Sequence, residues 1–545
     1  MTILVKVRTV LVLAAITLTV VLLLIPSTRE LLLFQCRQIF VSDRNSHVWS
    51  PSYESVADAH PDDMQIQIAD AQNVYNGYAG GYSSYASRNV LTSLESKFPS
   101  DPSVYANILR WLTVEGPKDS RPESNLAFGE RPPSTNGAAD ATFPYEFYDN
   151  AAVSGEKLDP KNAYFPLMRS IGLFGQHRDA EALAEIHRAA QDTTWKEYYQ
   201  DEVLGNWTIS DIRGRNIRTL DHVIASLGTQ FPQYARFRDI ARIALYKAML
   251  TQRSGHTAQG ISIRQDLMQC GSLMRSQSTS VIGSLVGIAI CSISTKNPKG
   301  INSENSETRS SLRSGYSAYC TFLKQNGYSE LIPCVQQEYM YDEQVRHVAE
   351  RGPELELDAF SRLYNILAVG VALLAAIFAL LVIAGIASLA LVCFQFKNKL
   401  CLAAMCAIAV LTVVLYRVLY FGIDEIRSFS IVDTISDSHM ATWIGLTFFI
   451  SLIAPMVCIK IISAVISLKH RKPLLQGVLT GLSKAVVPAA CLLFIIHGVI
   501  LWKAVQIEQV VNTQTVQRLQ SEGALDAKLL GEAWPGPTKW VELPN

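Results

Sequence analysis

Histidine and cysteine are the residues of this chain whose spacing would most directly reveal chemistry, because both bind metals and both take part in catalysis. The ten histidines are scattered. His177 lies ten residues before His187, a spacing that does not place two metal ligands on one face of a helix. The Gly-x-x-x-x-Gly-Lys-Ser/Thr, His-Glu-x-x-His, Cys-x-x-Cys and Gly-x-Ser-x-Gly motifs are absent. The sequence therefore predicts no catalytic residue, no metal site and no cofactor, and we expect a protein that is not an enzyme.

Cysteine placement suggests two disulfide bonds, provided that the domain that carries these residues lies in an oxidising compartment. Cys320 and Cys334 would close a helical hairpin, and Cys270 with Cys291 is the second candidate pair. Sequence spacing does not establish the Cα distance that a bridge requires. The alternative is that all four are buried free thiols.

One further candidate is a histidine inside a long apolar segment. Ionisable groups within a membrane are costly and are therefore candidates for function. Lys460 and Arg417 lie near the ends of their segments and can extend to the membrane surface, whereas His497 lies deep. His497 would relay a proton or bind a partner helix, or it would donate a hydrogen bond to a neighbouring carbonyl, as single buried histidines commonly do.

The composition indicates that these residues are positioned partly by membrane helices. The chain has 545 residues, of which 49% are apolar and 18% charged, with zero net charge and a mean hydropathy of +0.16. The zero net charge argues against nucleic acid as a partner. Bilayers need about 20 apolar residues per helix. Five segments meet this requirement, at 9–25, 363–396, 400–416 with an extension to 423, 440–468 and 485–502.

The predicted organisation follows from these spans. Residues 1–26 form an N-terminal anchor, or a cleaved signal peptide, although no small-x-small cleavage site follows the apolar run. Residues 27–362 form a large domain outside the membrane, 363–505 a four-helix membrane region, and 506–545 a C-terminal tail.

Lysine and arginine predict the orientation of the spans, because short cytoplasmic loops hold the positive charge. Lys6 and Arg8 place the N-terminus inside. The loops at 397–399 and 469–484 are basic and would lie inside, whereas the loop at 424–437 is mainly acidic and would lie outside. We therefore expect an integral protein of a bacterial-type cytoplasmic membrane, in contact with lipid, with its large domain and its tail on the outer side.

The large domain is predicted to be all-α. No period-two run of β-branched residues competes with its helical patterns. Residues 276–295 are uncharged and carry a Gly-x-x-x-Gly spacing, but a membrane span there would reverse the orientation of every later loop. We predict a buried helix of the domain at 276–295 instead. A separate segment, 115–143, is rich in Pro, Gly, Ser and Asn and is predicted to be a surface loop or linker. One helical face is predicted for Tyr234, Phe237, Ile240, Ala241, Ala244, Leu245, Ala248 and Met249.

Residues 158–190 resemble a tetratricopeptide repeat. Asp159-Pro160-Lys161-Asn162 is similar to the start of the family's first helix, and Ala182, Ile186 and Ala189 match positions of its second helix. Arg169, Ser170 and Pro166 depart from the pattern. A weaker echo at 87–112 contains Asp101-Pro102. The resemblance implies stacked helical hairpins, which in this family commonly form a surface for peptides or proteins. The alternative is an irregular helical domain with repeat-like turns.

Two functions are consistent with this organisation. The first is a membrane-anchored scaffold whose helical, repeat-like outer domain binds other envelope or membrane proteins. The alternative is a permease-like subunit of a transport system that works with a separate ATPase, which resembles permeases of the mechanotransmission type in outline. A eukaryotic secretory membrane is a further alternative for the location, in which Asn206-Trp207-Thr208 would accept a glycan.

Overall fold

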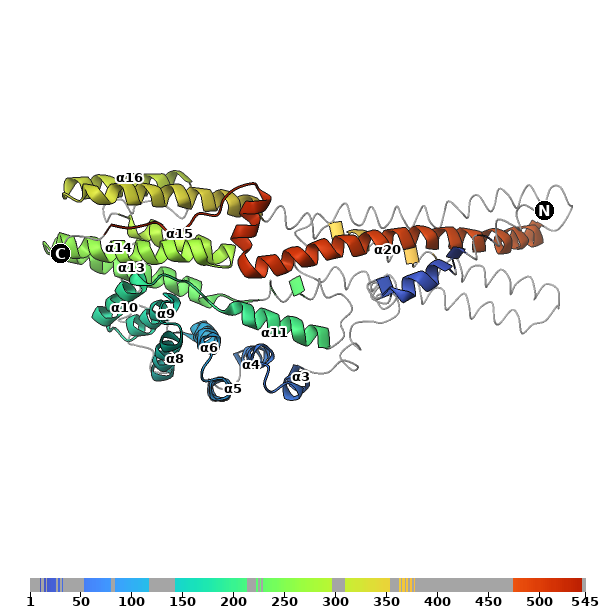
Figure 1. Cartoon of the computed structure of the whole chain (residues 1–545), viewed down its shortest axis with the longest axis horizontal. Coiled ribbons are helices and arrows are strands. Elements are labelled where there is room, and N and C mark those ends of the chain that lie inside the picture. Colours follow the sequence, from blue (N-terminus) through green and yellow to red (C-terminus); the bar gives the residue numbers. More distant parts are fainter. Residues whose placement is uncertain are drawn as a thin grey trace. The chain divides into compact units, whose positions relative to one another are not determined.

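The computed structural model describes residues 53–79, 84–116, 143–212, 229–296, 309–352 and 474–541, with isolated residues in 10–32, 222–226 and 362–377. The described residues form helices and no strand, so the predicted all-α fold is confirmed for them (Figure 1). Their one bridge of the β type is isolated and pairs Asn162 with Thr194.

The chain divides into two compact units. Residues 52–213, 220–355 and 514–545 form the first, which we call the helical domain. Residues 1–51, 214–219 and 356–513 form the second, which we call the hydrophobic unit. The helical domain contains α3 (Tyr53–Ala59), α4 (Met64–Ala79), α5 (Ser84–Lys97), α6 (Pro102–Glu115), α8 (Tyr145–Leu158), α9 (Tyr164–Gly175), α10 (Asp179–Gln191), α11 (Tyr199–Ile212), α13 (Pro232–Arg253), α14 (Thr257–Gln277), α15 (Val281–Ser294), α16 (Arg309–Gln325), η3 (Ser329–Leu331) and a further helix over 332–352.

The helices from α3 to α10 pack as neighbours in chain order. Local sequence explains where some of them begin. Asp101 accepts a hydrogen bond from the Ser103 amide and Pro102 occupies the first turn of α6, so the Asp-Pro pair does open a helix there. The Asp159-Pro160 pair does not, because α9 begins only at Tyr164.

Asn162 explains this later start. Its side-chain amide donates to the Lys196 carbonyl (2.9 Å) and its Oδ1 accepts from the Lys196 and Tyr164 amides (3.0 and 3.2 Å). The turn before α9 is thereby tied to the segment that follows α10. The α9–α10 hairpin itself lies where a helix pair is predicted, with Ala182, Ile186 and Ala189 fully buried. Its relationship to the tetratricopeptide repeat remains a prediction.

Two long helices, α13 and α14, and the shorter α15 form the centre of the domain. The predicted face of α13 is buried. α15 is only 14 residues long and packs against both other helices, so the prediction of a buried domain helix within 276–295 is confirmed. Glycine makes the close approach possible, because a Cβ on Gly287 would lie 2.5 Å from the Gly271 carbonyl oxygen. The predicted loop at 115–143 lies almost entirely outside the described residues.

The helix α20 (Leu474–Leu529) passes from the hydrophobic unit into the helical domain along the chain. Within the described residues it is the one helix whose length and composition would allow it to cross a membrane, over Pro488–Leu529, where an 18-residue stretch has a mean hydropathy of 1.9. The predicted span at 485–502 falls in it. The predicted spans at 400–423 and 440–468 lie outside the described residues, and those at 9–25 and 363–396 are described only in part. Five spans are therefore not shown.

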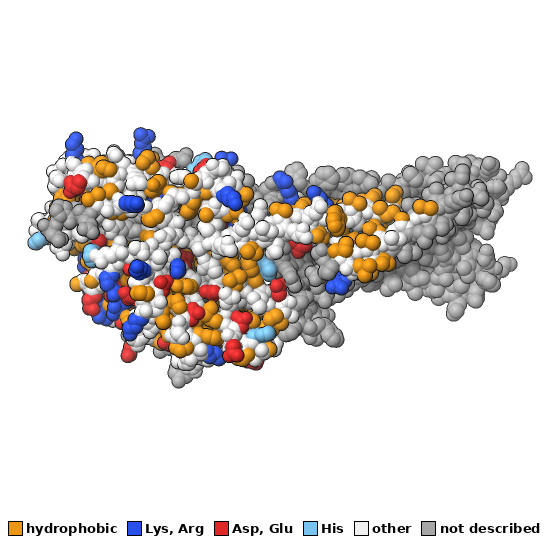
Figure 2. Space-filling model, in the orientation of Figure 1, with side chains coloured by type: hydrophobic (Ala, Val, Ile, Leu, Met, Phe, Trp, Pro, Cys, Tyr) orange, Lys and Arg blue, Asp and Glu red, His pale blue; other side chains and the backbone are white. Residues whose placement is uncertain are grey.

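Hydrophobic side chains gather along α20 in Figure 2, whereas acidic and basic side chains are spread over the surface of the helical domain. One face of α20 carries large exposed apolar residues at three- and four-residue intervals. They are Leu492 (52% exposed), Ile496 (43%), Val499 (66%) and Trp502 (51%).

The predicted tail at 506–545 begins as a continuation of this helix. Ser521 has extended backbone angles (φ −168°, ψ 101°), and α20 kinks there. The Ser521 hydroxyl accepts a hydrogen bond from the Ala524 amide (3.3 Å), so it caps the last stretch of helix. Glu522 accepts from the first amide of α15, that of Val281 (2.7 Å). The helix after the kink is therefore attached to the start of α15.

Candidate functional site

The C-terminal segment 532–541, which we call the strap, is extended and lies between α14 and the helix over 332–352 (Figure 1, dark red). Gly531, with φ +74°, ends the preceding helix, and the Glu532 amide donates to the Ala527 carbonyl (2.8 Å). This is the hydrogen-bond pattern with which a glycine commonly terminates a helix. His347 Nδ1 lies 2.9 Å from a Glu532 carboxylate oxygen where the strap begins. We call the space between the two helices the strap groove.

Side chains of the groove donate mainly to the main chain of the strap. Four strap carbonyls accept such bonds, and the donors come from both walls of the groove. They are Gln344 Nε2 to Ala533 O (2.6 Å), Arg275 Nη2 to Gly536 O (3.5 Å), Cys334 Sγ to Lys539 O (3.4 Å) and Gln265 Nε2 to Val541 O (2.8 Å). The strap contains Pro535 and Pro537, which favour an extended chain and lack an N–H, so at these two positions only the carbonyl can form a main-chain hydrogen bond.

Two strap side chains anchor it more specifically. The indole Nε1 of Trp534 donates to the Ser276 carbonyl (3.0 Å), and its ring lies against Gly523, where an added Cβ would come within 2.4 Å of it. The Thr538 amide donates to Ser272 Oγ (2.9 Å), and its hydroxyl donates to Glu338. These contacts set the register of the strap.

Thr538 meets a fully buried cluster of charged groups at the floor of the groove. Arg275 Nε lies 3.0 Å from a Glu338 carboxylate oxygen and 3.2 Å from one of Asp342, and all three side chains are fully buried. The Tyr316 hydroxyl donates to Asp342 (2.6 Å), and the Cys291 thiol to Glu338 (3.4 Å). The cluster thus connects α14, α15, α16 and the helix over 332–352.

Electrostatics explain how this cluster tolerates burial. Burial, and then the nearby Glu338 carboxylate, raise the pKa of Asp342 well above its ordinary value. This shift favours the neutral form of Asp342, which reduces the negative charge that the Arg275 guanidinium has to balance. Burial likewise raises the pKa of the Cys291 thiol, with Glu338 adding to the effect, so Cys291 remains a neutral donor.

Three of these groups could in principle hold a metal ion, since donor atoms of Cys291, Glu338 and Asp342 lie within 4.8 Å of one another. Arg275 Nε is already within hydrogen-bonding distance of both carboxylates. The charge that would attract a cation is therefore balanced by the chain's own guanidinium. We conclude that the buried cluster of Arg275, Glu338 and Asp342 forms the floor of the groove and holds the strap through the Thr538–Glu338 hydrogen bond.

The four cysteines of the predicted disulfides are free thiols in the structure. Cys270 Sγ contacts the Ile186 carbonyl (3.6 Å) on α10, whereas Cys291 contacts the Met268 carbonyl (3.5 Å) and Glu338. Cys334 binds the strap, and Cys320 is half-buried on α16. Cys291 and Cys334 thus belong to the groove in a role that the sequence did not suggest. The two bridges remain predictions, which a count of free thiols would test.

His497 is fully buried in α20, with its ring 6.0 Å from that of Phe494. It belongs to the hydrophobic unit, so it is no part of the strap groove. Its predicted role stays untested.

Sequence reasoning missed the residues that make the groove. Arg275 and Glu338 lie 63 positions apart and meet only in the folded domain. One usable signal was present, because Glu338 and Asp342 are four residues apart on one helix, a spacing that places two acids side by side.

Comparisons of the chain with protein-family models, with curated protein sequences and with solved structures found no significant match.

Proposed function

We propose that this protein is a membrane-anchored scaffold whose helical domain binds extended segments of other envelope or membrane proteins. The strap groove is the binding site in this proposal, and the strap is its intramolecular occupant. A partner segment takes the place of the strap when the strap is released.

The observation that carries the proposal is the direction of the hydrogen bonds in the groove. Side chains of α14 and of the helix over 332–352 donate hydrogen bonds to four carbonyls of the extended strap. Main-chain recognition depends little on side chains, so it suits any extended segment, while side-chain pockets select among segments. A partner segment with tryptophan, prolines and a hydroxyl residue at the spacing of Trp534 to Thr538 fits this groove best.

The membrane part of the proposal rests on the apolar segments. The exposed apolar face of α20 suits contact with lipid, and the four other apolar segments of the sequence would complete a multi-pass anchor. Basic loops at 397–399 and 469–484 support an N-terminus on the inner side and the helical domain on the outer side.

A test compares partner capture by three forms of the intact protein in native membranes. Thr538→Glu places a second carboxylate beside buried Glu338 and should release the strap by repulsion. Lys539→Gln makes the same change of charge at an exposed neighbouring position and serves as the matched control. We expect Thr538→Glu to retain more partner protein than the other two, with crosslinks to α14 and to the helix over 332–352.

Two results would overturn the proposal. Partner capture that is unaffected by Thr538→Glu would show that the groove is not the binding site. Recovery of an ATPase crosslinked through Lys469, Lys472 or Lys484 would instead make the protein a transport subunit.

A further inference from the structure

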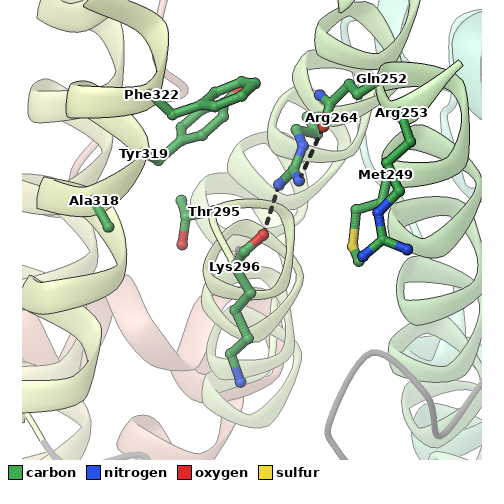
Figure 3. A pocket seen from close by; sticks show the side chains of 9 residues that line it. All are labelled: Met249, Gln252, Arg253, Arg264, Thr295, Lys296, Ala318, Tyr319 and Phe322. Carbon is green, nitrogen blue, oxygen red and sulfur yellow. Dashed lines mark hydrogen bonds between the residues drawn. The ribbon is translucent and has the colours of Figure 1, made fainter. Parts of the chain in front are cut away.

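A second site of the helical domain lies where α13, α14, α15 and α16 meet. It is a cleft of about 180 Å³ lined by nine residues (Figure 3). Figure 3 shows Arg264 between the rings of Tyr319 and Phe322 on one side and Met249 with Arg253 on the other. Tyr319 and Phe322 belong to the same hydrophobic cluster as Trp534 and Trp540 of the strap. None of the nine lining residues is one of the four donors that bind the strap carbonyls, so the cleft is a different set of side chains from the site of the proposed function.

Arg264 is the central residue of the cleft, and it is buried with only 3% exposed. Its guanidinium donates to the carbonyl of Ser294 (2.5 Å), the last residue of α15, to that of Lys296 (2.9 Å) and to the side-chain oxygen of Gln252 (3.5 Å). Its Nε has no hydrogen-bond partner among the described residues. Carbonyls at the end of a helix supply only a partial negative charge. The positive charge of Arg264 is therefore incompletely balanced by the described residues.

The rest of the lining supplies no acid to balance Arg264. Arg253 and Lys296 also line the cleft, and none of its nine described lining residues is acidic. Burial lowers the pKa of Arg264, but a guanidinium keeps its proton at any physiological pH. A bound anion would supply the charge that the walls lack.

The other walls are flat and apolar. The Arg264 guanidinium lies 5.5 Å from the centre of the Tyr319 ring and 6.0 Å from that of Phe322. These distances are typical of cations held against aromatic faces. The volume is informative too, because an apolar cavity of roughly 150 Å³ is known to hold benzene. A cleft of about 180 Å³ therefore has space for one ring and a carboxylate.

From this geometry we infer that the cleft binds a small organic anion, a carboxylate attached to a single planar ring. The carboxylate lies toward Arg264, Arg253 and Lys296, and the ring lies against Tyr319 and Phe322. The ligand is a free small molecule rather than a segment of the partner bound in the strap groove.

Equilibrium dialysis of radiolabelled benzoate against the full-length protein in nanodiscs tests this inference. Benzamide has the same shape without the charge and is the matched control ligand. We expect benzoate to bind about tenfold more tightly than benzamide, since charge-assisted hydrogen bonds are the stronger kind. Arg253→Gln and Lys296→Gln should each weaken benzoate binding about five- to tenfold, because each removes one cation from the cleft.

Lys324→Gln is the matched control variant, because it removes one exposed positive charge from α16 outside the lining. It should leave benzoate binding unchanged. Three results would overturn the inference: no binding of benzoate to the wild type, equal binding of benzamide, or equal weakening by Lys324→Gln. Inorganic phosphate that displaces benzoate as effectively as unlabelled benzoate would also overturn it, because the ring would then contribute nothing.

Discussion

Two buried arginines on the same helix, α14, have opposite surroundings. Arg275 is paired with Glu338 and close to Asp342, in a cluster closed on every side by the protein. Arg264, eleven residues earlier and therefore about three turns away, donates to main-chain carbonyls and faces a cleft. The first guanidinium is balanced by a carboxylate of the chain, and the second is not.

A buried charge can either stabilise one arrangement of the fold or attract a ligand, depending on what balances it. A paired buried charge stabilises one arrangement, because removal of either partner leaves the other uncompensated. A buried guanidinium balanced only by carbonyl dipoles retains a field that favours an anion. In this domain the paired arginine therefore attaches the strap, and the carbonyl-bound arginine forms a binding site.

The largest effect in this comparison is expected for Arg275→Met. It leaves Glu338 buried without its cation, which should lower the free energy of unfolding by about 3–5 kcal/mol. Urea or thermal unfolding of the purified protein measures this. Combination with Glu338→Gln should recover part of the loss, because the uncompensated carboxylate is removed. Equal stability of Arg275→Met and the wild type would contradict the structural role of the cluster.

Glu197 is a buried acid of the helical domain whose hydrogen-bond partners in the described residues are neutral side chains rather than a guanidinium. Glu197 accepts hydrogen bonds from Trp195 Nε1 (2.8 Å) and the Tyr234 hydroxyl (2.7 Å). Burial raises its pKa from 4.5 to about 7, against the opposing effect of these two bonds. A carboxyl group can thus escape an unbalanced charge by keeping its proton, which an arginine cannot do.

The sign of the resulting pH dependence follows from the raised pKa. The folded protein binds this proton more tightly than the unfolded chain, so the stabilisation is fully present below pH 4.5 and is lost as the pH rises to about 7. The loss should amount to about 3 kcal/mol. Glu197→Gln should remove this part of the pH profile of unfolding. A profile with the same slope in the variant would show that another group is responsible.

The smallest effect is expected for Arg264→Met. The variant loses charge-assisted hydrogen bonds to two main-chain carbonyls and to Gln252, but it also removes a buried charge that no carboxylate among the described lining residues balances. We expect a loss of about 1–2 kcal/mol, below that of Arg275→Met, in the same unfolding experiment. If Arg264→Met proved the more destabilising of the two, the comparison between the two arginines would be wrong.

Much of the fold could be predicted from local patterns. The apolar periodicity of α13 predicted its buried face. The charges of the later loops predicted that 276–295 is a buried helix rather than a membrane span, and α15 lies there. The start of α9 was missed because it depends on Asn162 binding the distant Lys196 main chain. Contacts of this kind do not appear in the local sequence.

The sites could not be predicted for the same reason. Nothing in the local sequence distinguishes Arg264, Arg275 and Glu338 from other charged residues of helices. Folding buries all three, and it brings Arg275 to Glu338 but leaves Arg264 without a paired carboxylate among the described residues. The sequence instead suggested disulfide bonds between cysteines and a functional role for His497, because cysteine and histidine are residue types with known chemistry. Only the Glu338 and Asp342 spacing hinted at an acidic pair, and its meaning depended on Arg275 from another helix.

The central claim, that the strap groove binds extended peptide segments, is tested most directly by adding the strap in trans. A fluorescent peptide of residues 531–545 is titrated into full-length wild-type protein and Thr538→Glu, after hydrogen exchange has shown that the variant releases its own strap. The account predicts binding to Thr538→Glu at least about tenfold tighter than to the wild type, whose own strap competes at high effective concentration. Failure of the peptide to bind the folded, strap-released variant would contradict the account.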